Sequence, residues 1–133
     1  MKKLMDAAKK AMMNAYAPYS GYFVGAAVET ADGSVYTGCN VENASYSPTN
    51  CAERTAIFKA VSEGHREITA VAVCGGKGGE IADFFPPCGV CRQVMAEFCG
   101  PDTPVYLIGK DEYKVVAFKD LLPHGFDSSM LEI

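Results

Sequence analysis

The 133-residue chain has no tryptophan, only two histidines and no run of about 18 apolar residues, the length that a membrane-spanning helix requires. We therefore expect no membrane partner. It also has no block of lysine or arginine, and its formal net charge is −4. Because an acidic surface is poorly suited to a phosphate backbone, we expect no nucleic-acid partner.

The features of a secreted protein are also missing. Lys2 and Lys3 are followed by an acidic residue and further lysines, so the N-terminus does not resemble a signal peptide. Six cysteines in so short a chain would otherwise favour a disulfide scaffold. We instead expect reduced thiols and a cytoplasmic protein. Hydrophobic residues make up 49% of the chain, enough for one core, and we predict a single domain over residues 1–133.

Three of the cysteines stand in two short segments, Cys51-Ala52-Glu53 and Pro87-Cys88-Gly89-Val90-Cys91. Thiolates bind Zn²⁺, and three protein ligands leave the fourth tetrahedral position free for a water whose pKa the zinc lowers. A carboxylate two residues from a ligand can exchange protons with that water. We predict one zinc ion per chain, held by Cys51, Cys88 and Cys91, with Glu53 as the catalytic residue.

Both segments have the pattern of a helix start. Apolar residues recur at helical spacing after Asn50 and after Pro86-Pro87, and proline is tolerated at a helix entry. The unpaired amides of a first turn favour thiolate over thiol. Cys51 and Glu53 are two residues apart, about 200° around a regular helix. They can therefore reach one metal ion only if it lies beyond the helix end.

Other interpretations of the cysteines have to be considered. A single CxxC also occurs in closed structural zinc sites and in redox dithiols. A closed site would need a fourth ligand from Cys39, Cys74 or Cys99, none of which stands in a second CxxC. The segment His65-Arg66-Glu67 also has H-x-E spacing. We expect it to be inert, because it follows Gly64 at a helix C-terminus, where the dipole favours cations.

The rest of the chain predicts an α/β fold. Periodic apolar residues predict helices over 3–16, 51–63 and 88–99, with a short turn over 118–122. Apolar runs predict strands over 23–30, 35–40, 68–74, 105–108 and 113–117, the first two forming a hairpin. Strand, helix and strand between 68 and 108 predict a parallel crossover. The glycine-rich residues 75–79 do not fit a phosphate-binding loop and predict a flexible surface loop.

The C-x-E and P-C-x-x-C segments match the signature of zinc nucleobase deaminases. Further segments extend the match, and with them the chain resembles the small homotetrameric cytidine deaminases over nearly its whole length. The resemblance implies a three-layer α/β/α fold, a mixed five-stranded sheet with helices on both faces. It also implies hydrolytic deamination of cytidine and 2'-deoxycytidine to the uridine products, with release of ammonia, a reaction of pyrimidine salvage. These segments are Pro18-Tyr19-Ser20, Val24-Gly25-Ala26-Ala27, Gly38-Cys39-Asn40-Val41-Glu42-Asn43-Ala44 and Leu121-Leu122-Pro123.

The resemblance implies roles for several other residues. Asn40 and Glu42 would bind the ribose hydroxyls, although polar residues at a strand exit can also serve turn chemistry alone. The backbone around Ala52 and Cys88 would contact the pyrimidine ring. Arg54 would offset the negative charge of three thiolates around Zn²⁺. For Arg92, which also follows a ligand segment, a solvated helix position is an equal alternative.

The aromatic residue that stacks on the ring departs from the family pattern. The usual phenylalanine position falls on Tyr22, with Phe23 next, and successive strand side chains point to opposite faces. We predict that Tyr22 contacts the ring and that Phe23 packs in the core. The resemblance also places Ala44, Tyr46 and Phe126 in the pocket of a neighbouring subunit of a homotetramer. The alternative is that the apolar tail around Phe126 folds back on its own core.

Two rival functions follow from the same residues. One is deamination of a polynucleotide or of a modified nucleoside, against which the acidic charge and the pair Asn40 and Glu42 argue. The other is a zinc-stabilised binding module without chemistry. Glu53 argues against that module, because a structural zinc site has no use for a carboxylate beside it.

Overall fold

The computed structural model describes residues 1–131, and its sheet contains five strands. The strand order is β2-β1-β3-β4-β5, in which only β3 and β4 run parallel. The predicted mixed sheet and the parallel crossover are therefore confirmed. The elements are α1 (Lys2–Met12), β1 (Tyr22–Thr30), β2 (Val35–Cys39), α2 (Ala52–Ser62), β3 (Ile68–Lys77), α3 (Gly89–Phe98), β4 (Pro104–Ile108), β5 (Tyr113–Ala117), α4 (Phe118–Leu121) and a 3-10 turn, η1 (Ser128–Met130).

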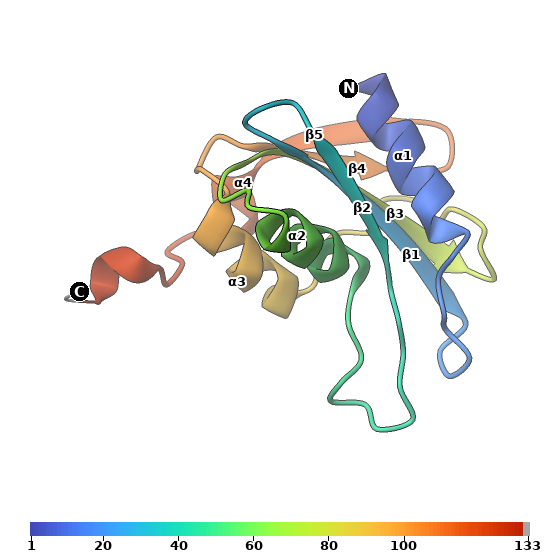
Figure 1. Ribbon diagram of the computed structural model, residues 1–133. Coiled ribbons are helices and arrows are strands. Elements are labelled where there is room, and N and C mark those ends of the chain that lie inside the picture. The colour runs from blue at the N-terminus through green and yellow to red at the C-terminus, as the bar shows by residue number, and fades with distance from the viewer. Residues whose placement is uncertain (132–133) are drawn as a thin grey trace.

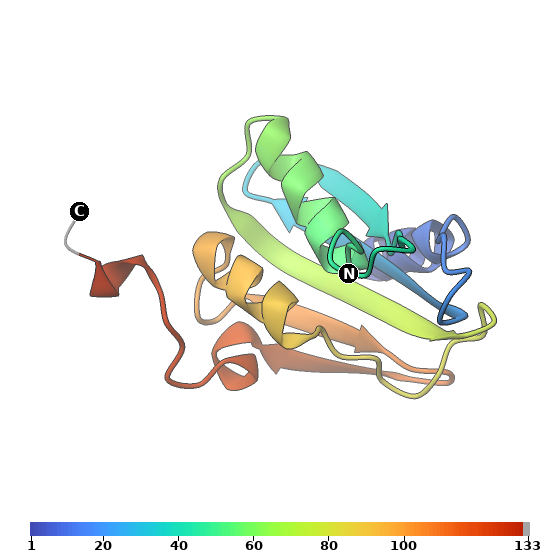
Figure 2. The same cartoon turned by 90° about the horizontal axis from the view of Figure 1, so that it is seen from below.

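Helices cover both faces of the sheet, as predicted. α1 lies on one face, and α2 and α3 lie side by side on the other (Figures 1 and 2). Alternate residues of β1 serve the two cores: Ala26 and Val28 pack under α2 and α3, whereas Ala27 packs under α1. No helix within residues 1–131 is both long enough and apolar enough to cross a membrane.

Two glycines allow a helix to lie directly on a strand. A Cβ atom at Gly38 of β2 would lie 2.6 Å from the carbonyl oxygen of Ala52 and 2.5 Å from the amide nitrogen of Ala56, both in α2. A Cβ atom at Gly25 of β1 would lie 2.1 Å from the carbonyl oxygen of Ala8 in α1. Neither strand position can carry a side chain unless the helix moves. Gly38 thus fixes the height of the first turn of α2 above the sheet.

The prediction that the first helix reaches residue 16 was wrong. α1 ends at Met12, and Tyr16 instead forms an isolated parallel bridge with Val41. The amide of Tyr16 donates to the carbonyl of Asn40 at 3.0 Å, and the amide of Glu42 donates to the carbonyl of Tyr16 at 2.9 Å. These tertiary hydrogen bonds replace the last helical turn.

The prediction of a flexible loop over residues 75–79 was wrong for its first three residues. β3 continues to Lys77, and Gly75 pairs with Val24 of β1. A Cβ atom at Gly76 would lie 1.7 Å from the carbonyl oxygen of Glu80, because the chain folds back over the strand there. The glycines therefore provide room beside a buried strand.

The remaining predicted strands and helices agree with the structure to within one or two residues at each end.

Candidate active site

The three predicted ligand cysteines meet at the N-termini of α2 and α3. Cys51 and Cys88 are the N-cap residues of these helices and have extended backbone, and Cys91 lies in the first turn of α3. The Sγ atom of Cys88 is 3.6 Å from that of Cys51 and 3.5 Å from that of Cys91. All three sulfur atoms lie within 4.8 Å of one another, beyond the helix ends, where the spacing of Cys51 and Glu53 requires the metal ion to be.

This cluster fits a zinc ion with one open position. Zn–S bonds of about 2.3 Å in tetrahedral geometry place sulfur atoms about 3.8 Å apart, close to the separations found here. A disulfide would need about 2.05 Å, and all six cysteines are free thiols in the described part of the chain. Within residues 1–131 no fourth histidine, cysteine or carboxylate ligand joins the cluster. These residues therefore do not form the closed four-ligand zinc site that the sequence analysis considered as an alternative.

Unequal protonation of the thiols follows from their contacts. The hydrogen bond that the Cys91 thiol donates to Cys51 is the largest cause that lowers the pKa of Cys51 to about 5. A hydrogen bond from Arg54 also lowers it. The pKa of Cys91 is raised for the converse reasons, first by its hydrogen bond to Cys51 and then by burial. The metal-free cluster therefore favours a thiolate at Cys51 and a thiol at Cys91, so metal binding has to release the proton of Cys91.

The two arginines that follow the ligand segments have different roles. Nη2 of Arg54 donates to Sγ of Cys51 at 3.3 Å, in agreement with its expected effect on the thiolates. Its Nε is buried without a hydrogen-bond partner among the described residues. Arg92 does not contact a thiolate: Nε donates to the carbonyl of Pro87 and Nη1 to the carbonyl of Leu121, each at 2.8 Å. Arg92 thus joins the entry of α3 to the end of α4.

Glu53 is the buried acid of the site. Its side chain lies in the first turn of α2, and only 3% of the residue is exposed. Burial is the main cause that raises the pKa of Glu53 to about 7, and the negative charge of Cys51 adds to it. A carboxyl group with a pKa near neutral pH can both accept and return a proton under physiological conditions.

A cavity of about 320 Å³ adjoins Glu53 and two of the cysteines. Tyr22 lines this cavity, whereas Phe23 packs with the core under α1, so alternation along β1 separates them as expected. Sequence analysis missed Phe85, whose ring centroid lies 6.3 Å from that of Tyr22. The lining residues are Ser20, Tyr22, Val24, Asn40, Glu42, Thr49, Asn50, Cys51, Ala52, Glu53, Phe85, Pro86 and Cys88.

Asn40 and Glu42 also line the cavity, and their hydrogen bonds hold its wall together. The Asn40 amide accepts from the Val24 N–H at 2.8 Å and donates to the Tyr22 carbonyl at 2.7 Å. Oε1 of Glu42 accepts the N–H groups of Tyr19 and Ser20 at 3.0 and 3.1 Å, and Oε2 accepts the Ser20 hydroxyl. These bonds, led by that of the Ser20 hydroxyl, lower the pKa of Glu42. One Asn40 N–H and lone pairs on Glu42 remain available.

Ala44, Tyr46 and Phe126 do not line this cavity. Ala44 and Tyr46 lie in the loop between β2 and α2, which projects from the body of the molecule, and Tyr46 is 78% exposed (Figure 1). Phe126 is 54% exposed, and its carbonyl accepts a hydrogen bond from Nε2 of Gln93 at 2.9 Å. Within one chain, these residues are not brought together with the cysteine cluster.

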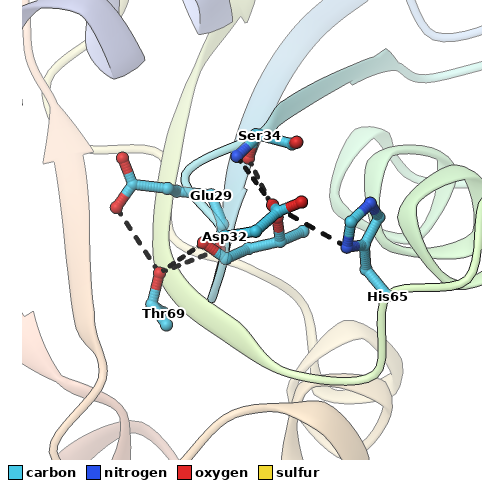
Figure 3. A network of polar contacts seen from close by, with 6 residues as sticks. Glu29, Asp32, Ser34, His65 and Thr69 are labelled. Atoms are coloured by element: carbon cyan, nitrogen blue, oxygen red, sulfur yellow. Dashed lines mark hydrogen bonds and ion pairs between the residues drawn. The ribbon is translucent and has the colours of Figure 1, made fainter.

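His65 also lies away from the cluster, in a separate polar network (Figure 3). Its Nδ1 is 3.8 Å from Oδ1 of Asp32, and the Thr30 hydroxyl is the largest of the hydrogen-bond donors that lower the pKa of Asp32 to about 2. The 11 residues of α2 separate His65 from Cys51, a rise of about 16 Å. Figure 3 also shows the hydroxyl of Thr69, which donates a hydrogen bond to the carboxylate of Glu29 at 3.4 Å.

The geometry places the protein among the zinc-dependent hydrolases. A structural zinc site has all four positions filled by protein ligands and no acid beside them, whereas here three cysteines meet and two of them line a cavity that Glu53 also lines.

Within that class, the chain belongs to the cytidine and deoxycytidylate deaminase family, whose zinc-binding region matches residues 1–107. The cytidine deaminase of Sporosarcina psychrophila is 48% identical over 132 residues, 98% of this chain and 94% of that protein. That of Halalkalibacterium halodurans is 50% identical over 124 residues, 92% of this chain and 91% of that protein. The crystal structure of cytidine deaminase from Burkholderia pseudomallei matches with a TM-score of 0.86 at 48% identity, covering 94% of this chain and 98% of that one.

Proposed function

We propose that the protein hydrolyses cytidine and 2'-deoxycytidine to uridine and 2'-deoxyuridine with release of ammonia, as a step of pyrimidine salvage. The observation that carries this proposal is the position of Glu53, a buried acid that shares one cavity with the thiolate cluster. Cys51, Cys88 and Cys91 would hold the zinc ion. When bound, zinc supplies a Lewis acid that makes water nucleophilic at neutral pH.

Glu53 would carry every proton of the reaction. It takes one proton from the attacking water and delivers it to N3 of the pyrimidine, so that C4 becomes electrophilic. It then takes the second proton from the hydroxyl now bound to C4 and delivers it to the amine, so that the C4–N bond breaks, ammonia leaves and the C4 carbonyl forms. Its raised pKa suits both directions of transfer, because neither protonation state is strongly favoured near pH 7. Burial excludes bulk water from the carboxyl group, so no other donor competes with it.

The cavity also fits a sugar. After its hydrogen bonds to the backbone, Asn40 retains one N–H donor, and Glu42 retains lone pairs that can accept. A donor and an acceptor together suit two neighbouring hydroxyl groups of a sugar. Tyr22 offers an aromatic side chain to the same cavity, which Ala52 also lines. The Glu42 carboxylate would repel a 5'-phosphate, so we favour nucleosides over deoxycytidylate as substrates.

An absorbance assay of the zinc-loaded protein tests the proposal directly. We expect turnover of cytidine and 2'-deoxycytidine, with little or no turnover of deoxycytidylate or of single-stranded oligonucleotides. Turnover of deoxycytidylate in preference to the nucleosides would overturn the choice of substrate. Zinc binding without turnover of any cytosine compound would support the rival binding module.

We also propose that the protein is a homotetramer in which Ala44, Tyr46 and Phe126 reach the site of a neighbouring chain. Tyr46 and Phe126 are largely exposed apolar side chains, and none of the three residues lines the cavity of its own chain. Exposed aromatic side chains of this kind favour burial between subunits.

Mixing two inactive variants tests this arrangement. A Glu53→Gln chain lacks the acid, and a chain truncated before Phe126 lacks the cap, so mixed tetramers should recover partial activity. A fully active monomer by light scattering would contradict the proposal. Cysteine ligands need a reducing compartment, so we retain the cytoplasm as the predicted location, with residues 1–133 acting as one domain.

A further inference from the structure

The segment between β3 and α3, residues 78–88, contains a strained residue at Phe84. Phe84 has φ +21°, in a region that residues other than glycine rarely adopt. Pro86 and Pro87 then restrict the backbone immediately before Cys88. Strain of this kind persists only where the surrounding structure holds it, and it is common near functional sites.

The turn separates two adjacent phenylalanines. The ring of Phe84 lies at the β4–β5 side of the sheet: Nζ of Lys114 is 4.6 Å from its centroid, and a Cβ atom at Gly109 would lie 3.2 Å from its Cε1. Phe85 instead lies over β1 and β3, where it lines the cavity beside Tyr22. Phe84 is not among the described residues that line this cavity.

Gly75 provides the place that the Phe85 ring occupies. A Cβ atom at Gly75 would lie 3.0 Å from Cδ1 of Phe85 and 3.0 Å from Cγ2 of Val24. The ring therefore fills the space above β3 that any larger residue at Gly75 would take. A glycine on the strand and a strained residue before the ring together fix Phe85 as one wall of the cavity.

The chemistry of the reaction identifies the edge of the pyrimidine that faces this wall. C4 has to lie at the cysteine cluster, and N3 has to face Glu53, which protonates it. C5 is the other ring neighbour of C4, so it faces away from Glu53. Glu53 and Cys51 come from the start of α2, whereas Phe85 and Cys88 come from the segment that enters α3. C5 therefore points toward the side of the cavity that Phe85 forms.

We propose, on the basis of the proposed function, that Phe85 is a specificity-determining residue that limits the size of the substituent at C5 of the pyrimidine ring. The ring of Phe85 leaves room for the hydrogen of cytidine and opposes a methyl group. The protein would thus discriminate against 5-methylcytidine, and Gly75 acts as the residue that positions Phe85.

The test compares kcat/KM for 5-methylcytidine and cytidine in the native protein and in Phe85→Val. We expect the ratio of 5-methylcytidine to cytidine to rise by about tenfold or more, the range in which a pocket discriminates one methyl group. Phe84→Leu is the matched control, because it shortens the adjacent phenylalanine, which faces Gly109 and Lys114. It should lower thermal stability and leave the ratio unchanged.

A binding measurement separates this effect from the chemical step. Calorimetric affinities for uridine and 5-methyluridine, the two products, should converge in Phe85→Val while the zinc content stays the same. Phe85→Leu serves in the same assays if the valine variant does not fold. An unchanged ratio in a Phe85 variant that still turns over cytidine would overturn the inference, as would an equal change in Phe84→Leu. Failure of the proposed function would show differently, as absence of cytidine turnover by the zinc-loaded native protein.

Discussion

Gly25 and Gly38 lie one step apart in the β1–β2 register, and each supports a helix on a different face of the sheet. Gly25 pairs with Cys39, and Gly38 pairs with Ala26. Because Gly38 contacts the first turn of α2, a methyl group there would push Cys51 and Glu53 away from the cysteines of α3.

We therefore predict that Gly38→Ala weakens zinc binding by on the order of tenfold, the size of effect found when support of a metal ligand is lost. Gly25→Ala disturbs α1 on the opposite face and should lower thermal stability with zinc affinity nearly unchanged. Competition with a chromogenic chelator measures both affinities. Equal loss of affinity in the two variants would show that general destabilisation, and not the position of α2, controls the metal site.

Glu53→Gln should retain zinc and nucleoside binding but reduce kcat by about 10²–10⁴-fold, because the amide keeps the shape of the side chain and cannot transfer protons. Metal analysis, uridine binding and the absorbance assay give the three readouts. Activity near that of the native protein would rule out Glu53 as the proton carrier.

The same substitution should change the pH dependence of stability in the metal-free protein. Below about pH 4.5 the carboxyl group is protonated in both states, and between about 4.5 and 7 only the unfolded chain loses the proton. Relative to Glu53→Gln, the free energy of unfolding of the native protein should therefore fall by up to about 3 kcal/mol as pH rises through this window and remain lowered above pH 7. The lowered pKa of Cys51 acts in the opposite direction, but it is common to both proteins and cancels in this difference. Urea unfolding of both proteins after chelation measures this difference, and a difference that stays constant from about pH 4.5 to 7 would exclude Glu53 as its source.

Tyr22→Ala should raise KM for cytidine more than Phe23→Ala does. Tyr22 lines the cavity with Glu53, whereas Phe23 packs under α1. Phe23→Ala should chiefly lower the melting temperature, because it removes partly buried core contacts. Steady-state kinetics with thermal unfolding of both variants would reveal the reverse order if Phe23 contacts the ring.

The meeting of Cys51, Cys88 and Cys91, the parallel crossover and the two helix starts were accessible from the sequence because they depend on local patterns and on residue chemistry. The end of α1 was not, because the hydrogen bonds between Tyr16 and the chain around Val41 come from a distant segment. Gly75 had the composition of a loop, and only its neighbours in space show why a glycine stands in a buried strand. Phe85 gave no local signal at all, since its place over β3 depends on the turn at Phe84.

The origin of the ligands in two separate helices has a consequence for the folding of the chain. Cys51 and Cys88 are 37 residues apart in sequence, so an ion bound to both closes a long loop in the way that a cross-link does. By the chain-entropy relation for disulfides, a loop of this length restricts the denatured ensemble by about 4 kcal/mol. Metal removal would thus free the whole loop that contains α2 and β3 in the denatured chain, and the ion would raise the free energy of unfolding as well as supply chemistry.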